Sequence, residues 1–278
     1  MTATTISKAP ESSPGRAGRL RHAVADAWVL TGWELLHWRR NPGAVLGAVA
    51  FPLIMAVMFG FVFGSAMNVP GGGDYREFLM PGMFGQTMAM GVVTTVSVMA
   101  ISATRGLTDR YRSMPMSALG PVAGRACADM VSSAIELTLM MACGLLIGWR
   151  VHNGPGPALA AAGLLLLLRF SLIWVGVWLG LRLSPEAATT AWMPMFPLTM
   201  LASTFVSPAQ LPAPLRVIAE WNPLSATVTA CRELFGNPGS PGGSWPAAHA
   251  LELALAWPLL ITAIFLPLAV RRYRRLDR

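Results

Sequence analysis

Residues 105–116 gather side chains that could recognise another molecule, and they lie between two long apolar segments. This stretch, which we call the basic cassette, contains three arginines, an aspartate, a tyrosine and a proline. Guanidinium groups form directional ion pairs and hydrogen bonds, and a tyrosine combines an apolar ring with a polar tip. The cassette is too short and too polar to form a domain. We therefore interpret it as a surface that a membrane protein offers to a soluble partner.

Elsewhere the sequence lacks the common patterns of catalytic and metal-binding sites. It contains no GxxxxGK[ST], HExxH or GxSxG pattern, and its single lysine, Lys8, lies close to the N-terminus. A lysine-containing phosphate-binding loop is therefore excluded. The three cysteines form no CxxC pair, which argues against a disulfide framework or a zinc site. We expect that the chain is not an enzyme and holds no cofactor or metal.

Composition indicates a polytopic membrane protein. Of the 278 residues, 54% are hydrophobic and 12% are charged, and the mean hydropathy is +0.53. Soluble domains carry about 25% charged residues. The net charge of +8 fits arginines retained on the cytoplasmic side of a membrane better than nucleic-acid binding.

Six apolar segments are long enough to cross a hydrocarbon layer of about 30 Å, which needs about 20 residues each. The predicted spans are 43–64, 79–103, 126–148, 158–181, 187–207 and 247–270. With the N-terminus inside, the inner segments hold 16 of the 21 lysines and arginines. Because cytoplasmic loops retain basic residues, we expect an all-α integral membrane protein with both termini in the cytoplasm.

Two flanking regions add shorter elements to this plan. Residues 1–18 are rich in serine, proline and glycine and are expected to be a disordered cytoplasmic tail, whereas 19–278 form the transmembrane domain. Apolar residues recur every three or four positions over 19–40, which predicts an amphipathic helix in the plane of the lipid headgroups. The proline-rich segment 208–246 predicts short outer-side helices that dip toward the membrane before the sixth span.

Two charged residues lie deep in predicted spans. Arg169 interrupts the leucines of the fourth span, and Glu136 lies about equally deep in the third. An unpaired arginine at the centre of a span costs about 2.5–3.5 kcal/mol on insertion scales. Since the two spans are consecutive and antiparallel, we hypothesise an ion pair between Arg169 and Glu136. The pair could fix helix packing or line a substrate path; a helix boundary other than the predicted one would also account for the depth of these charges. Asp129, nearer the inner end of the third span, is expected to be structural.

Several sequence boxes, in their order along the chain, resemble one family. They are Arg40-Asn41-Pro42, Tyr75-x-x-Phe78-Leu79-x-Pro81-Gly82, Asp109 to Met116 with Gly124-Arg125-x-x-Ala128-Asp129, Leu211-Pro212, Trp221-Asn222-Pro223-Leu224 and Arg232-Glu233-Leu234. The chain resembles the permease subunit of type-2 ABC exporters, most closely the daunorubicin-resistance-type permeases of actinobacteria. Many related permeases carry Glu-x-Gly in the cytoplasmic loop. Thr108-Asp109-Arg110 stands here instead, which favours the drug-type branch and leaves the substrate open.

The resemblance implies a bacterial plasma-membrane protein with soluble and membrane partners. It implies two copies of a cytosolic ATPase that bind ATP and magnesium, a second and identical permease, surrounding lipids and an amphipathic small-molecule substrate such as an antibiotic. In such exporters the N-terminal interfacial helix and the loop after the second span contact the ATPase. The residues carried over to that contact are Trp33, Arg39, Arg40, Asp109, Arg110, Tyr111, Arg112, Met114 and Pro115.

Alternative functions remain open on the sequence. The cargo of an exporter could be a lipid or glycan precursor. A proton-coupled secondary carrier would need acidic residues deep in several spans, whereas only Glu136 is clearly deep. A membrane enzyme would need polar catalytic groups clustered at one membrane interface, and the sequence shows none.

Overall fold

The computed structural model describes residues 42–64, 69, 72–104, 120–239 and 243–276. The basic cassette and the predicted amphipathic helix lie outside the described residues. Within the described part, the chain forms helices joined by turns, which confirms the predicted all-α class there.

The helices follow one another in a simple order. They are α2 (Pro42–Val57), the π-helical turn η1 (Met58–Phe63), α3 (Tyr75–Thr104), α5 (Gly120–Ile147), α6 (Pro155–Gly180), α7 (Pro185–Thr189), α8 (Trp192–Met200), the 3-10 turn η2 (Pro208–Gln210), α9 (Ala213–Glu220), α10 (Pro223–Phe235), α11 (Trp245–Ala248) and α12 (Ala250–Leu276). Four of the described helices, α3, α5, α6 and α12, are long and apolar enough to cross a membrane. They correspond to the second, third, fourth and sixth predicted spans.

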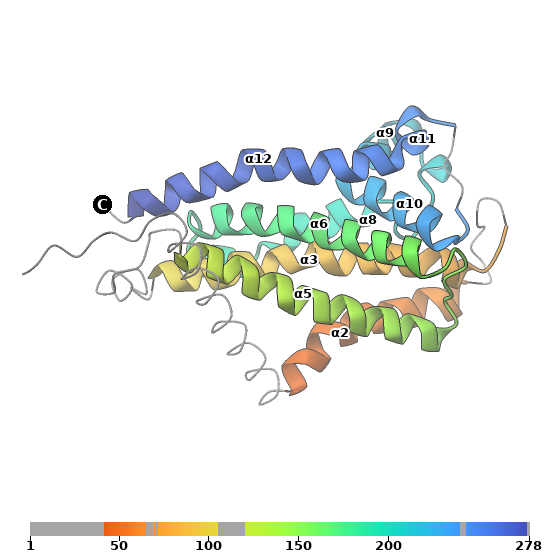
Figure 1. Ribbon diagram of the computed structural model, residues 1–278, viewed down its shortest axis with the longest axis horizontal. Coiled ribbons are helices and arrows are strands. Elements are labelled where there is room, and N and C mark those ends of the chain that lie inside the picture. Colours follow the sequence, from red (N-terminus) through yellow and green to blue (C-terminus); the bar gives the residue numbers. More distant parts are fainter. Residues whose placement is uncertain (1–41, 65–68, 70–71, 105–119, 240–242, 277–278) are drawn as a thin grey trace, which may run out of the picture.

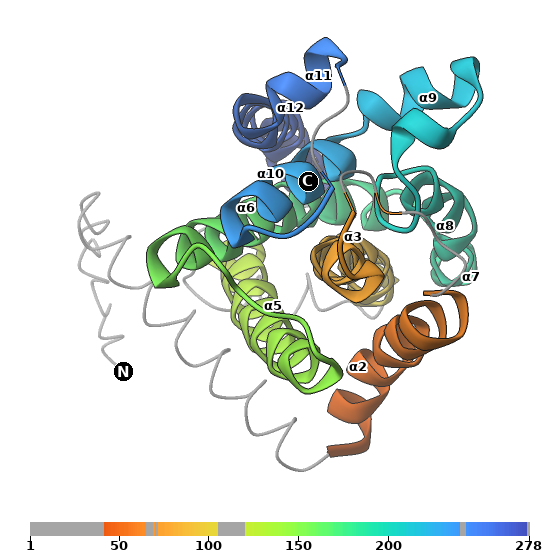
Figure 2. The same cartoon turned by 90° about the vertical axis from the view of Figure 1, so that its right-hand side faces the viewer.

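The long helices run side by side, and α9, α10 and α11 gather at the end where α12 begins (Figure 1). Seen along the bundle, α3 is central, with α2, α5, α6 and α8 around it (Figure 2). Small residues allow α6 to approach α3 closely. A Cβ atom added at Gly180 would lie 2.6 Å from the Val96 carbonyl oxygen, and one at Gly176 would lie 2.8 Å from Thr95 Cβ. Glycines four residues apart are a common way for membrane helices to pack tightly.

The predicted fifth span, 187–207, is not one continuous helix. It is divided between α7 and α8, and turns follow α8 at residues 201–206. Pro197 lies inside α8 and cannot donate a helical hydrogen bond, and Ser203 and Thr204 follow in the turns. The break leaves several backbone groups without helical partners, so other parts of the chain must satisfy them.

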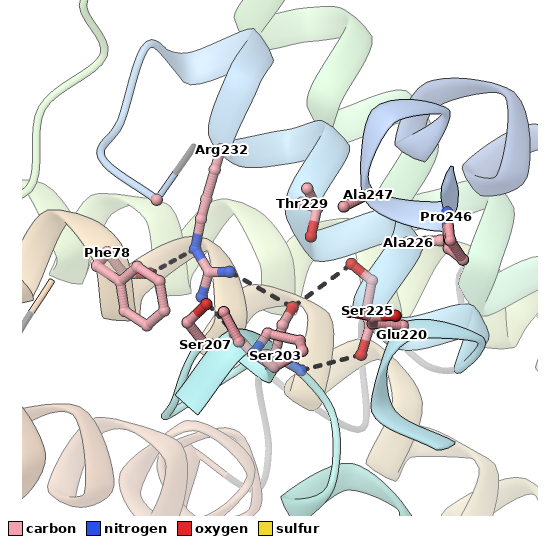
Figure 3. Close-up of a pocket in the computed structure, with 13 residues that line it drawn as sticks. Phe78, Ser203, Ser207, Glu220, Ser225, Ala226, Thr229, Arg232, Pro246 and Ala247 are labelled. Carbon is pink, nitrogen blue, oxygen red and sulfur yellow. Dashed lines mark hydrogen bonds between the residues drawn. The ribbon is translucent and has the colours of Figure 1, made fainter. Parts of the chain in front are cut away.

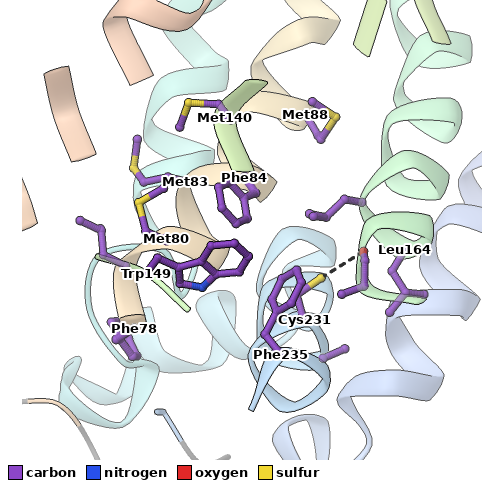
Figure 4. Close-up of a cluster of buried hydrophobic side chains, with 14 of the residues drawn as sticks. Phe78, Met80, Met83, Phe84, Met88, Met140, Trp149, Leu164, Cys231 and Phe235 are labelled. Carbon is purple, nitrogen blue, oxygen red and sulfur yellow. Dashed lines mark hydrogen bonds between the residues drawn. The ribbon is translucent and has the colours of Figure 1, made fainter. Parts of the chain in front are cut away.

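A buried cluster of aromatic and methionine side chains joins α3 to α10 and to the end of α5 (Figure 4). The rings of Phe84, Trp149 and Phe235 meet edge to face, with centroids 5.0 Å apart for Phe84–Trp149 and for Trp149–Phe235. Such pairs add about 0.5–1.5 kcal/mol beyond area burial. The indole Nε1 of Trp149 donates to Asn237 Oδ1 at 2.7 Å. This cluster fixes the end of the bundle where the short helices lie.

The segment 208–246 contains short helices as expected, namely η2, α9, α10 and α11. The apolar residues of α10 at helical spacing, Leu224, Val228, Cys231 and Phe235, are all buried. Asn222 caps α10, because its side-chain oxygen accepts a hydrogen bond from the Leu224 amide at 2.9 Å.

Candidate functional site

A group of polar side chains, four of them buried and Arg125 partly exposed, lies where α3, α5 and α6 meet. Its members are Thr95, Arg125, Asp129, Ser133 and Arg169, which we call the Arg169 cluster. Thr95 is 0% exposed, Ser133 2%, Arg169 4% and Asp129 5%. Buried charges in a spanning bundle are expensive unless they are paired, so their neighbours identify the role of the group.

Arg169 makes polar contacts with two helices. Its Nε donates to Ser133 Oγ at 2.8 Å, and its Nη2 donates to Thr95 Oγ1 at 3.1 Å. Nη2 also lies 3.8 Å from Asp129 Oδ2. Thr95 in turn donates to Asp129 Oδ2 at 2.8 Å. The network therefore joins α6 to both α3 and α5 at one level of the bundle.

Asp129 is shared between two guanidinium groups. Arg125 lies one helical turn before it and places Nη2 2.5 Å from Asp129 Oδ1, which is closer than Arg169 comes. Both residues belong to the box Gly124-Arg125-x-x-Ala128-Asp129, so this part of the motif has a structural explanation. Asp129, which the sequence placed nearer the inner end of the third span, has a buried side chain.

Gly91 of α3 makes room for the arginine. A Cβ atom there would lie 2.7 Å from Arg169 Cζ and 2.8 Å from Nη1. Any larger residue at this position would displace the guanidinium group. Nη1 is buried and has no hydrogen-bond partner among the described residues.

The predicted ion pair between Arg169 and Glu136 is not a contact of this conformation. Within the described part of the chain, the carboxylate at ion-pair distance from Arg169 is that of Asp129. Glu136 is partly buried two turns beyond Asp129 along α5. The pair therefore stays a prediction.

The broken segment after α8 is held by side chains of other helices, a set that we call the backbone clamp. Tyr75 donates to the Phe205 carbonyl at 2.9 Å, Asn222 Nδ2 donates to the Leu198 carbonyl at 2.9 Å, and Ser225 Oγ accepts from the Ser203 amide at 3.0 Å. Arg232 is the fourth member. Irregular backbone at membrane depth is tolerated only where the protein satisfies it in this way.

Arg232 is 2% exposed and is surrounded by backbone oxygens. Its Nε donates to the Phe78 carbonyl at 2.9 Å, and its Nη2 donates to the carbonyls of Ser203 at 2.6 Å and Thr204 at 3.3 Å. The guanidinium carbon also lies 3.7 Å from the centroid of the Phe78 ring. Burial lowers the pKa of Arg232, while the carbonyl oxygens replace the water that would otherwise solvate its charge.

A pocket with about 490 Å³ of empty space, part of it open to solvent, lies beside Arg232 (Figure 3). Figure 3 shows the guanidinium turned toward Phe78 and Ser203, at one side of the pocket. The hydroxyls of Ser225 and Thr229 and the carboxylate of Glu220 are among the remaining lining groups. A ligand in this pocket would therefore meet hydroxyl groups and a carboxylate, because the guanidinium group of Arg232 is already bonded to backbone carbonyls of the clamp.

The candidate residues of the predicted ATPase contact lie outside the described residues. They are Trp33, Arg39, Arg40, Asp109, Arg110, Tyr111, Arg112, Met114 and Pro115. Of the predicted site, the structure describes only Glu136 and Arg169. In the described part of the chain, no three His, Cys, Asp or Glu side chains are grouped so that they could hold a metal ion.

Comparison with known proteins adds a family to this geometry. The model of the ABC-2 type transporter family matches residues 26–235. The daunorubicin resistance ABC transporter permease protein DrrB1 of Streptomyces coeruleorubidus is 28% identical over 263 residues, which cover 94% of this chain and 89% of the relative. The probable doxorubicin resistance ABC transporter permease protein DrrC of Mycobacterium tuberculosis is 25% identical over 197 residues, which cover 68% of this chain and 65% of the relative.

Proposed function

Because this chain belongs to the ABC-2 type transporter family, we propose that it is the permease subunit of an ATP-driven exporter of an amphipathic, drug-like or antibiotic molecule. The observation that carries the proposal is the similarity to a daunorubicin resistance permease over 94% of the chain. The long apolar helices fit this reading, since a permease must form a path across the membrane.

Six membrane crossings are part of the proposal. The helices α3, α5, α6 and α12 supply four of them, α2 with η1 supplies the first, and the divided segment 187–207 supplies the fifth. The end of α3, the start of α5 and the end of α12 lie at the same end of the bundle (Figure 1). That end carries Arg125 and the arginines at 271, 272, 274 and 275, which supports a cytoplasmic location for it and for both termini.

The partners follow from what the chain lacks. It has no lysine-containing phosphate-binding loop, so ATP and magnesium would bind to two copies of a separate cytosolic ATPase. Residues 105–119 connect α3 to α5 at the basic end of the bundle, where such a subunit could reach the basic cassette. A second, identical permease would complete the path, and closure of the ATPase pair would open it outward between the two protomers.

Copurification tests the assignment. The chain is expressed with a candidate ABC ATPase subunit from the same organism, and we expect the two to purify together from membranes. Reversing two charges of the basic cassette, Arg110→Glu with Arg112→Glu, should abolish copurification. The matched control is Arg274→Glu with Arg275→Glu, which changes the same number of charges at the end of α12. Retained copurification and ATPase activity in the cassette variant would disprove the contact.

The cargo needs a separate measurement. Daunorubicin is expected to stimulate the ATPase activity of the purified complex in lipid. If lipid or glycan precursors stimulate the complex and daunorubicin does not, the exporter belongs to the alternative cargo class.

A further inference from the structure

Three polar residues of α5 form a stripe along one face. Asp129, Ser133 and Glu136 are separated by four and three positions, the spacing that places side chains above one another on a helix. Asp129 and Ser133 are buried, and Glu136 is partly buried. The stripe therefore offers two carboxylates with a hydroxyl between them.

Arg169 lies beside the middle of this stripe. Its Nε is held by Ser133 Oγ at 2.8 Å, and its Nη2 points toward Asp129 at 3.8 Å. With a rise of 1.5 Å per residue, Asp129 lies about 6 Å before Ser133 along the axis and Glu136 about 4.5 Å beyond it. A change of rotamer at Arg169 can therefore bring its guanidinium group to either carboxylate.

In the described conformation, both Arg169 and Glu136 have polar atoms that are available for further bonds. Asp129 lies 2.5 Å from Arg125 and 3.8 Å from Arg169, so its ion pair with Arg169 is the weaker of the two. The Nη1 atom of Arg169 is buried and has no hydrogen-bond partner among the described residues, and Glu136 forms no ion pair in the described part of the chain. Arg169 on α6 therefore has a buried nitrogen without a hydrogen-bond partner, and Glu136, one turn beyond Ser133 on α5, has a carboxylate without a cationic partner among the described residues.

We propose that Arg169 exchanges its carboxylate partner from Asp129 to Glu136 during each transport cycle, as α5 shifts along its axis relative to α6. This inference rests on the proposed function, because the ATP-driven cycle supplies the displacement. Residues 105–119 lead directly into α5, whose early turns carry Arg125 and Asp129. A pull on that end of α5 moves Asp129 with Arg125 and away from Arg169. The guanidinium then turns to Glu136, so Arg169 and Glu136 are positioning residues for the outward-open state.

State-dependent thermal stability separates this exchange from a static packing role. The permease–ATPase complex is melted without nucleotide and after trapping with ATP, magnesium and vanadate. Glu136→Gln should leave the melting temperature of the nucleotide-free complex unchanged and lower that of the trapped complex. Asp129→Asn should lower the melting temperature of the nucleotide-free complex by more than that of the trapped complex. Glu252→Gln, the same change at an exposed position of α12, should change neither.

Turnover provides the second measurement. Glu136→Gln should reduce ATP-dependent daunorubicin transport by about tenfold, which corresponds to about 1.4 kcal/mol, and Glu136→Asp should restore part of it. The exchange is wrong if Glu136→Gln transports at the wild-type rate. It is also wrong if Glu136→Gln destabilises the nucleotide-free complex, fails to assemble, or leaves the trapped complex unaffected. Absence of daunorubicin transport by the wild type would contradict the proposed cargo, and the melting experiment would still decide the exchange.

Discussion

Replacement of Arg232 by methionine tests the backbone clamp, because methionine is unbranched, uncharged and has no hydrogen-bond donor. The wild-type guanidinium donates two short bonds, at 2.9 Å to the Phe78 carbonyl and at 2.6 Å to the Ser203 carbonyl. Hydrogen bonds to a charged group contribute about 1.5–3 kcal/mol each. Their loss would destabilise the fold by about 3–6 kcal/mol, and removal of a buried charge offsets part of this. We expect a net loss of about 3 kcal/mol.

The assay is thermal unfolding of the purified permease, followed by its tryptophan fluorescence. A loss of about 3 kcal/mol predicts a fall in melting temperature of about 6–12 °C for a chain of this size. Arg232→Lys keeps the charge but lacks the planar guanidinium group, so its melting temperature should lie between those of the wild type and Arg232→Met. Arg216→Met is the control, since that side chain is 49% exposed and pairs only with Glu220 among the described residues. Equal melting temperatures for Arg232→Met and the control would refute the clamp.

Two further substitutions test how the helices are held. Gly180→Leu places a side chain against α3, where a Cβ alone would lie 2.6 Å from a backbone oxygen, and should destabilise the permease by about 1–3 kcal/mol. Gly163→Leu on the same helix, with nothing within 4 Å, should have little effect on the melting temperature, and equal effects would contradict the close packing. Asn222→Ala removes both the α10 cap and the donor to the Leu198 carbonyl and should cost about 2 kcal/mol. Asn222→Ser keeps a cap oxygen and lacks the donor to the Leu198 carbonyl, so it should melt between the wild type and Asn222→Ala; equal melting temperatures for Ser and Ala would argue against the cap.

The sequence predicts the long helices because the apolar length of a span depends on the membrane alone. The second, third, fourth and sixth predicted spans appear as α3, α5, α6 and α12. The divided helix in the fifth was not predicted, although Pro194 and Pro197 were visible, because neighbouring helices can often satisfy the carbonyls that a proline frees. Only the fold shows which side chains do so in this chain.

The partners of individual polar residues were harder to predict. Asp129 and Glu136 are seven residues apart and therefore share a face of α5, so helical periodicity could not decide which of them contacts Arg169. Arg232 belongs to a recognisable box, but its ligands are backbone carbonyls from segments far away in the sequence. Carbonyl groups have no residue type, so no sequence pattern could have indicated them.

ATP-dependent accumulation of daunorubicin in inside-out membrane vesicles tests the central claim most directly. Vesicles that contain this chain and its ATPase should accumulate the drug when ATP and magnesium are supplied. Vesicles in which the lysine of the ATPase phosphate-binding loop is replaced by alanine should not. Accumulation that needs ATP and both subunits is the predicted result. Uptake that persists without the ATPase and follows a proton gradient would contradict the assignment as an ABC export permease.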